Sequence, residues 1–149
     1  MRRRVFLFGI GAVVATSPSA QTADVWSAAQ TQAALEAGQV VLVDIRSREE
    51  WAETGVAQGA LPVSLHEDGF GERLFQVRQL AGDRPVALIC ATGGRTAYVM
   101  QALRQGGYSG FVDVSEGMMG SALGRGWIAA GLPVVSAQDA LSELPDSLR

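Results

Sequence analysis

The feature that most constrains this fold is an apolar run that ends at the only cysteine and passes through two glycines into a helical pattern. Residues 86–89 are apolar throughout, which is typical of a strand buried on both faces. Gly93 and Gly94 allow the positive φ angles of a tight turn, and Thr96 can cap the helix expected over residues 96–105. Amides of such a loop can form an anion-binding nest at the helix N-terminus.

The loop after this strand also carries the candidate chemistry. A thiol near a guanidinium and a helix N-terminus has a stabilised thiolate, and the thiolate is the nucleophile. Without such neighbours, a lone cysteine at a strand end is a small buried hydrophobic residue. Arg95 supplies a permanent charge and a planar fork of donors suited to oxyanions. The candidate catalytic residue is Cys90, and the candidate substrate-binding residues are Ala91, Thr92, Gly93, Gly94, Arg95 and Thr96.

Apolar runs alternate with helical patterns along the rest of the chain. Strands are expected over residues 25–26, 40–44, 63–65, 86–89 and 111–114, and helices over 27–36, 47–54, 67–80, 96–105 and 127–130. This alternation predicts a mainly parallel sheet covered on both faces by helices. In such sheets ligands bind at the carboxyl ends of the strands, where Cys90 and Asp44 both lie. We see no internal repeat and no second domain.

The composition narrows the classes of function. A chain of 149 residues with 48% hydrophobic residues suits one domain with an ample core. The net charge of −3, without a basic patch interleaved with aromatics, argues against nucleic acid as a partner. One cysteine and one histidine exclude a Cys/His zinc site, so no metal is expected.

The N-terminal residues have the pattern of a secretory signal peptide. Arg2, Arg3 and Arg4 are followed by an apolar run over residues 5–15 and by small polar residues up to Ala20. The run is too short to span a bilayer as a helix, although an uncleaved membrane anchor is the alternative. The paired arginines also resemble a twin-arginine export signal. We therefore expect a periplasmic or secreted protein without stable membrane insertion, exported by the Sec or twin-arginine route.

These patterns divide the chain into three parts. Residues 1–20 are the signal peptide, with cleavage expected between residues 20 and 23. Residues 24–136 form the domain. Residues 137–149 are expected to be a weakly ordered C-terminal tail.

Four segments, in order, resemble the blocks of a single-domain rhodanese. Residues 41–51 resemble a strand ending in Asp-x-Arg before an acidic-aromatic helix, and residues 55–62 resemble the Gly-His-Ile-Pro-Gly-Ala segment. Residues 90–96 match the Cys-x-x-Gly-x-Arg-Ser/Thr active loop, and residues 116–134 resemble the closing block with Trp and Gly-x-Pro-Val. The resemblance implies a rhodanese-like α/β fold, a three-layer α/β/α arrangement around a central, mainly parallel sheet.

The resemblance also implies a sulfurtransferase that needs no cofactor. Cys90 would take the outer sulfur of thiosulfate or of a persulfide donor, hold it as a covalent persulfide, and pass it to a thiol, a protein acceptor or cyanide. The loop amides and the helix dipole would stabilise the anionic sulfur, and Arg95 would hold the anionic donor. Asp44 and Arg46 would support the loop, with Asp44 orienting it rather than reacting.

Several alternatives stay open. A structural role for Arg95, as an ion pair with Asp44 or Glu49, is as well supported by the sequence as donor binding. The enzymatic rival is a cysteine phosphatase or arsenate reductase, whose loops place five residues between cysteine and arginine where this chain has four. A non-enzymatic sulfur carrier or binding module would keep a Cys90 persulfide and turn thiosulfate over slowly.

Two regions depart from the family pattern. Val56 and Gln58 replace the usual histidine and proline, which affects packing of that turn more than chemistry. Residues 118–126 form a longer, glycine-rich segment, for which an exposed insertion is favoured over a flap on the active loop. His66, the only histidine, is expected to be a surface residue rather than a general base.

Overall fold

The computed structural model describes residues 24–149, so the predicted signal peptide and its cleavage site lie outside the described residues. A four-stranded sheet has the order β3-β1-β4-β5, and all its neighbouring strands are parallel. Its strands are β1 (Val41–Asp44), β3 (Leu61–Pro62), β4 (Val86–Ile89) and β5 (Phe111–Asp113). An antiparallel pair, β2 (Val56–Ala57) and β6 (Val134–Val135), lies apart from this sheet. The predicted mainly parallel sheet is confirmed.

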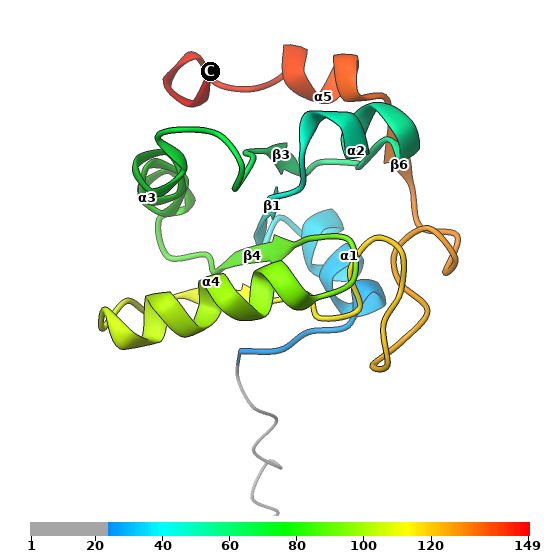
Figure 1. Ribbon diagram of the computed structural model, residues 1–149, viewed down its shortest axis with the longest axis horizontal. Helices are drawn as coiled ribbons and strands as arrows, with labels where there is room; N and C mark the ends of the chain where they lie inside the picture. Colours follow the sequence, from blue (N-terminus) through cyan, green and yellow to red (C-terminus); the bar gives the residue numbers. More distant parts are fainter. Residues whose placement is uncertain (1–23) are drawn as a thin grey trace, which may run out of the picture.

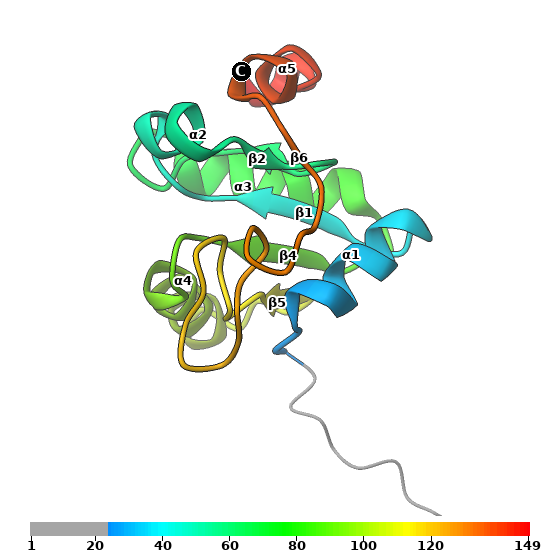
Figure 2. The ribbon, with the colours of Figure 1, turned by 90° about the vertical axis from the view of Figure 1, so that its right-hand side faces the viewer.

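Helices cover both faces of the sheet (Figures 1 and 2). They are α1 (Ala28–Glu36), α2 (Arg48–Thr54), α3 (Phe70–Ala81), α4 (Gly94–Gln105), α5 (Ala137–Ser142) and the short 3-10 helix η1 (Asp146–Leu148). Successive side chains of β4 enter two different cores, as the alternation of a strand requires. Leu88 packs in the cluster that includes α3 and α4, whereas Ala87 packs in the cluster that includes Ala28 of α1 and Trp51 of α2. The molecule therefore has three layers.

The C-terminal segment is ordered, so the expectation of a weakly ordered tail is wrong. Ser136 caps α5 by accepting a hydrogen bond from the backbone N–H of Asp139. Leu144 and Leu148 are buried in the core shared with α3 and α4. Figure 1 shows α5 above β3, which is an edge strand of the sheet. Burial of these two leucines stabilises the C-terminal segment, although most residues around them in the sequence are polar.

Three other predicted elements differ in the structure. Residues 127–130 form turns rather than a helix, because the segment between Gly126 and Gly131, both at positive φ, is too short to repay helix nucleation. The strand expected over residues 63–65 appears instead as β3, two residues earlier. At residues 25–26 the chain makes a single parallel bridge from Val25 to β5. Within the described residues, no helix is long and apolar enough to cross a membrane.

Candidate active site

Cys90 lies at the carboxyl end of β4, a central strand between β1 and β5. Its side chain is buried, with a relative exposure of 1%. The loop after it turns into α4 at Gly94, and Gly93 is the N-cap at φ +90° without a side-chain cap. Thr96 therefore lies inside α4, and the prediction that it caps this helix is wrong. The tight turn at Gly93 starts the helix two residues earlier than the sequence indicates.

The thiol of Cys90 contacts donors from the start of α4. The backbone N–H of Gly93 donates to Sγ at 3.2 Å, and Oγ1 of Thr96 lies 3.7 Å from Sγ. Thr96 Oγ1 also donates to the carbonyl of Gly93 at 3.1 Å. The first amides of a helix lack intrahelical acceptors and carry partial positive charge. This end of α4 is thus suited to a thiolate or another anionic sulfur.

The segment over residues 115–119 holds the shape of the Cys90 loop. Backbone N–H groups of Met118 and Met119 donate to the carbonyls of Cys90 and Ala91, each at 2.8 Å. A Cβ on Gly117 would lie 2.2 Å from the Ala91 carbonyl oxygen, so only glycine allows this approach. Met118 is fully buried, whereas Leu123 is 67% exposed. Residues 119–125 are largely exposed, as expected of an insertion, but residues 121–123 also line a hollow together with Thr92 and Gly93, so the segment lies beside the Cys90 loop.

Arg95 forms an ion pair with Glu50 of α2. Its Nη1 and Nη2 donate to the two carboxylate oxygens at 2.7 and 2.6 Å. The hydrogen bonds from Arg95 lower the pKa of Glu50 from 4.5 to about 2, and Glu50 raises the pKa of Arg95. The predicted partners Asp44 and Glu49 are wrong, because helical spacing turns Glu50 toward the loop and leaves Glu49 in solvent.

Local interactions hold Glu50 in this position. Ser47 caps α2, and the Glu50 carboxylate accepts a hydrogen bond from the Ser47 backbone N–H at 3.0 Å, which completes a capping box. The Ser-x-x-Glu spacing of this box is a signal in the sequence that the expectations above did not use. The same carboxylate thus serves the end of α2 and the guanidinium of Arg95.

His66 is a further neighbour of Arg95 that sequence reasoning missed. Its Nε2 lies 2.9 Å from Arg95 Nη1, and the residue is exposed, as expected. His66 follows β3 closely in the chain, and the carboxyl ends of neighbouring parallel strands meet at one edge of a sheet. That position after β3 is the only signal that could have indicated the contact.

Asp44 and Arg46 form a buried ion pair at the end of β1. Both side chains are at most 1% exposed, and Arg46 Nη2 lies 2.7 Å from Asp44 Oδ2. Arg46 also donates to Thr54 Oγ1 and to the Gly55 carbonyl, each at 2.8 Å. These contacts tie β1 to the end of α2. The pair thus supports the helix that carries Glu50, and Asp44 lies beside Ile89, the residue before Cys90.

The charges at the site nearly cancel. The guanidinium of Arg95 faces the carboxylate of Glu50, and Arg46 faces Asp44. Among residues 24–149, no three His, Cys, Asp or Glu side chains are grouped so as to hold a metal ion. The arrangement is a buried thiol at a helix N-terminus, flanked by one arginine whose charge is already paired.

The sequence of this chain is similar to those of known proteins. The model of the rhodanese-like domain family matches residues 27–121. A sulfurtransferase from Allochromatium vinosum is 30% identical over 101 residues, which cover 66% of this chain and 81% of that protein.

Solved structures share the fold. A rhodanese-related protein from Thermoplasma volcanium is 26% identical with a TM-score of 0.54, and the match covers 75% of this chain and 97% of that one. A polysulfide-sulfur transferase homodimer from Wolinella succinogenes, at 22% identity, has a TM-score of 0.54 over 76% of this chain and 78% of that chain. The predicted rhodanese-like α/β arrangement is confirmed.

Proposed function

This chain belongs to the rhodanese-like domain family, and from that premise we propose that it transfers sulfur through a persulfide on Cys90. The family and its sulfurtransferase relative indicate sulfurtransferase activity. The observation that carries the assignment to Cys90 is the hydrogen bond from the Gly93 N–H to its Sγ, at the head of α4. Such a donor stabilises the thiolate, and the thiolate is the attacking species.

The proposed reaction has two displacements on sulfur. In the first, the Cys90 thiolate attacks the outer sulfur of thiosulfate, the S–S bond of the donor breaks, and sulfite leaves with the electron pair. Cys90 then carries a persulfide anion, which the loop amides and the dipole of α4 stabilise. In the second, an acceptor thiolate attacks the outer sulfur and restores the Cys90 thiolate. Cyanide as acceptor would give thiocyanate, and neither step needs a cofactor.

The paired charge of Arg95 bears on the choice of donor. Thiosulfate is a dianion, and its natural counter-charge, Arg95, already faces Glu50 at 2.6 Å. We therefore propose that thiosulfate binds weakly and that a persulfide donor of lower charge is used more efficiently. Because the buried ion pair of Asp44 and Arg46 is also neutral overall, it adds no attraction for a dianion.

A sulfur carrier is the second candidate function, and the same ion pair favours it. A carrier would accept sulfur on Cys90 and pass it to one partner protein faster than it turns over thiosulfate. The cysteine phosphatase is disfavoured, since four residues between Cys90 and Arg95 make a ring one residue smaller than those that hold phosphate. If the protein hydrolysed a small aryl phosphate and Cys90→Ser abolished that hydrolysis, the phosphatase would be favoured over sulfur transfer.

Intact mass spectrometry tests the proposal directly. The protein is incubated with thiosulfate or with cysteine persulfide, and its mass is measured before and after cyanide. We expect one added sulfur atom that cyanide removes, and no such adduct on Cys90→Ser. If both donors leave the mass unchanged while the thiol still reacts with an alkylating reagent, the persulfide mechanism is wrong.

We also propose that residues 1–20 direct export to the periplasm or the medium. The basic, apolar and small-residue order of these residues supports this proposal. Expression in a bacterium followed by mass analysis of the accumulated protein tests it. A processed chain that begins between residues 21 and 24 is expected, whereas a full-length chain in the cytoplasm would contradict export.

A further inference from the structure

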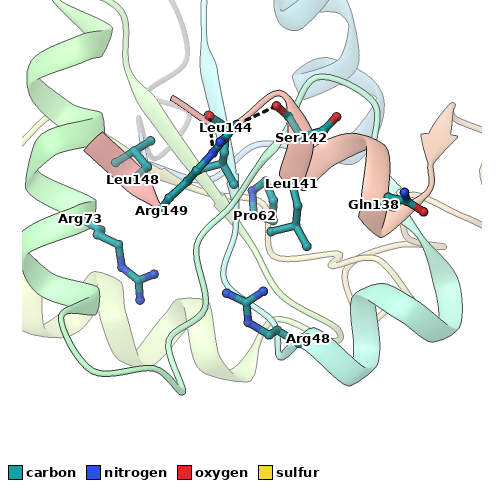
Figure 3. Close-up of a pocket in the computed structure, with 9 residues that line it drawn as sticks. All are labelled: Arg48, Pro62, Arg73, Gln138, Leu141, Ser142, Leu144, Leu148 and Arg149. Carbon is teal, nitrogen blue, oxygen red and sulfur yellow. Dashed lines mark hydrogen bonds between the residues drawn. The ribbon is translucent and has the colours of Figure 1, made fainter. Parts of the chain in front are cut away.

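A groove lies where α2, α3 and the C-terminal segment meet beside β3. Its volume is about 760 Å³, within the usual range of small-molecule sites. Figure 3 shows the side chains that line it, with arginines around leucines and a proline. The groove is distinct from the Cys90 loop, because none of its lining residues belongs to that loop.

One wall of the groove is apolar and well packed. Pro62, Leu141, Leu144 and Leu148 contribute to it. Leu144 and Leu148 are 3% and 1% exposed, so the core holds them in place. The partly exposed Leu141 supplies most of the apolar surface that the hydrocarbon part of a ligand would contact, and the buried leucines hold it in place.

Three arginines from separate parts of the chain face the same groove. Arg48 comes from α2, Arg73 from α3 and Arg149 from the segment after η1 (Figure 3). Backbone carbonyls of Ser142 and Leu144 hold the Arg149 guanidinium at 2.9 and 3.2 Å. All twelve basic residues of this chain are arginines, whose planar fork matches a carboxylate better than an ammonium does.

The acidic groups nearby leave positive charge in excess. Glu67 alone serves both Arg48 and Arg73, the latter at 3.3 Å, and hydrogen bonds from Arg48 lower its pKa. Asp146, the partner of Arg149 at 3.4 Å, is 96% exposed, so water screens that pair. Among the described residues, no acidic side chain lines the groove itself.

Arg73 has an unused donor. Its side chain is 16% exposed, and its Nε atom is buried without an acceptor among the described residues. A buried donor without an acceptor destabilises the folded protein, and more so when the group is charged. Nη1 and Nη2 of Arg73 each donate one hydrogen bond, to Glu67 and to the Asp68 carbonyl, and each keeps a second N–H for an anionic oxygen in the groove.

We propose that this groove binds an amphipathic carboxylate, with the carboxylate on the arginines and the hydrocarbon chain on the leucines. Arg73 is the central contact, because its mostly buried side chain holds the guanidinium at the groove with terminal N–H groups still unpaired. This site requires neither Cys90 nor sulfur transfer, so it stands or fails independently of the proposed function.

Isothermal titration calorimetry of the full chain with decanoate, below its micelle-forming concentration, tests the proposal. Decan-1-ol is the uncharged comparison of equal chain length. We expect decanoate to bind about tenfold more tightly than decan-1-ol, since a charge-assisted bidentate contact is worth at least that factor. Equal binding of the two compounds, or no binding of decanoate, would overturn the proposal.

Two arginine variants and two controls locate the site. Arg73→Gln should weaken decanoate binding about tenfold. Arg48→Gln, at a side chain 57% exposed, should weaken it about threefold without risk to folding. Arg104→Gln on α4 is the matched control and should bind as the wild type does, as should Cys90→Ser. Unchanged binding in folded Arg73→Gln and Arg48→Gln would place the ligand elsewhere and contradict the proposal.

Discussion

At the scale of single residues, the site depends on how one thiol and one guanidinium are surrounded. Cys90 Sγ accepts a hydrogen bond from the backbone N–H of Gly93. The two terminal nitrogens of the Arg95 guanidinium both donate hydrogen bonds to the carboxylate of Glu50. The Gly93 N–H therefore points at the sulfur, whereas the positive charge that would attract an anionic sulfur donor is shared with Glu50. This arrangement leads to three predictions.

Cys90→Ser is expected to abolish persulfide formation with little loss of stability. The hydroxyl is nearly the size of the thiol and can accept the Gly93 hydrogen bond, so the free energy of unfolding should change by less than about 1 kcal/mol. Mass spectrometry after donor treatment and urea unfolding measure the two effects. Unfolding of the variant at ordinary temperature would point to a packing role for Cys90.

Glu50→Gln is expected to improve the use of thiosulfate. Without the carboxylate, Arg95 presents an unshared charge to the donor, and KM should fall about two- to fivefold, the factor that a partly exposed ion pair is worth. An amide keeps the size of the side chain and can still accept the capping hydrogen bond from Ser47. Steady-state kinetics with thiosulfate and cyanide test this prediction. A higher KM for thiosulfate in Glu50→Gln would contradict it and would show that Glu50 positions Arg95 for the donor.

The same pair makes a prediction about pH. The pKa of Glu50 is lowered from 4.5 to about 2 in the folded protein, so the unfolded state binds the proton first. Stability from this pair is therefore present above pH 4.5 and is lost as the pH falls toward 2. Urea unfolding across this window should show a steeper loss for the wild type than for Glu50→Gln. Identical slopes would mean that solvent screens the pair completely.

At the scale of secondary-structure elements, the loop after β4 keeps its shape because residues 115–119 pack against it. Gly93 and Gly117 both lie at positive φ, and a Cβ on either would lie within 2.4 Å of a backbone carbonyl oxygen. The close approach of two backbones positions the N–H groups of Met118 and Met119 on the loop carbonyls.

Gly117→Ala is expected to destabilise the protein more than its backbone conformation alone explains. Gly38 is a matched control, since its φ is +67° against +69° for Gly117 and its Cβ would meet nothing within 4 Å. Gly38→Ala should cost about 1–2 kcal/mol, the usual penalty for a left-handed residue. Gly117→Ala should cost more, because its Cβ collides with Ala91, and it should reduce persulfide formation. Equal unfolding free energies for the two variants would exclude the close approach.

At the scale of the whole molecule, the C-terminal segment completes the core on the side of α3 and α4. Leu148→Ala should destabilise the protein by about 2–5 kcal/mol, because it removes a side chain that is 1% exposed. Leu123→Ala, at a side chain 67% exposed, should change stability by less than about 0.5 kcal/mol. Thermal and urea unfolding of both variants test this. Equal effects would mean that the segment after β6 does not contribute to the core.

Much of the fold was predictable because its signals are local. The apolar runs of β1, β4 and β5, and the glycine turn after Cys90, lie within a few residues of one another in sequence. The prediction of a helix over residues 127–130 was wrong, since four apolar and small residues between two glycines are equally compatible with a turn. The order of residues 137–149 was not predictable, because the few leucines of this segment are separated by polar residues. That these leucines are buried is evident only when the segment is packed against the rest of the protein.

The sequence by itself determined the strand, the cysteine loop and the helix, and with them the family, because each depends on the spacing of neighbouring residues. Only the tertiary structure decided the environment of Arg95. Its partners Glu50 and His66 are 45 and 29 positions away, so their contacts exist only once β1, β3 and β4 align their carboxyl ends. The same holds for the arginine groove, whose three guanidiniums meet because α2, α3 and the C-terminal segment pack around the β3 edge.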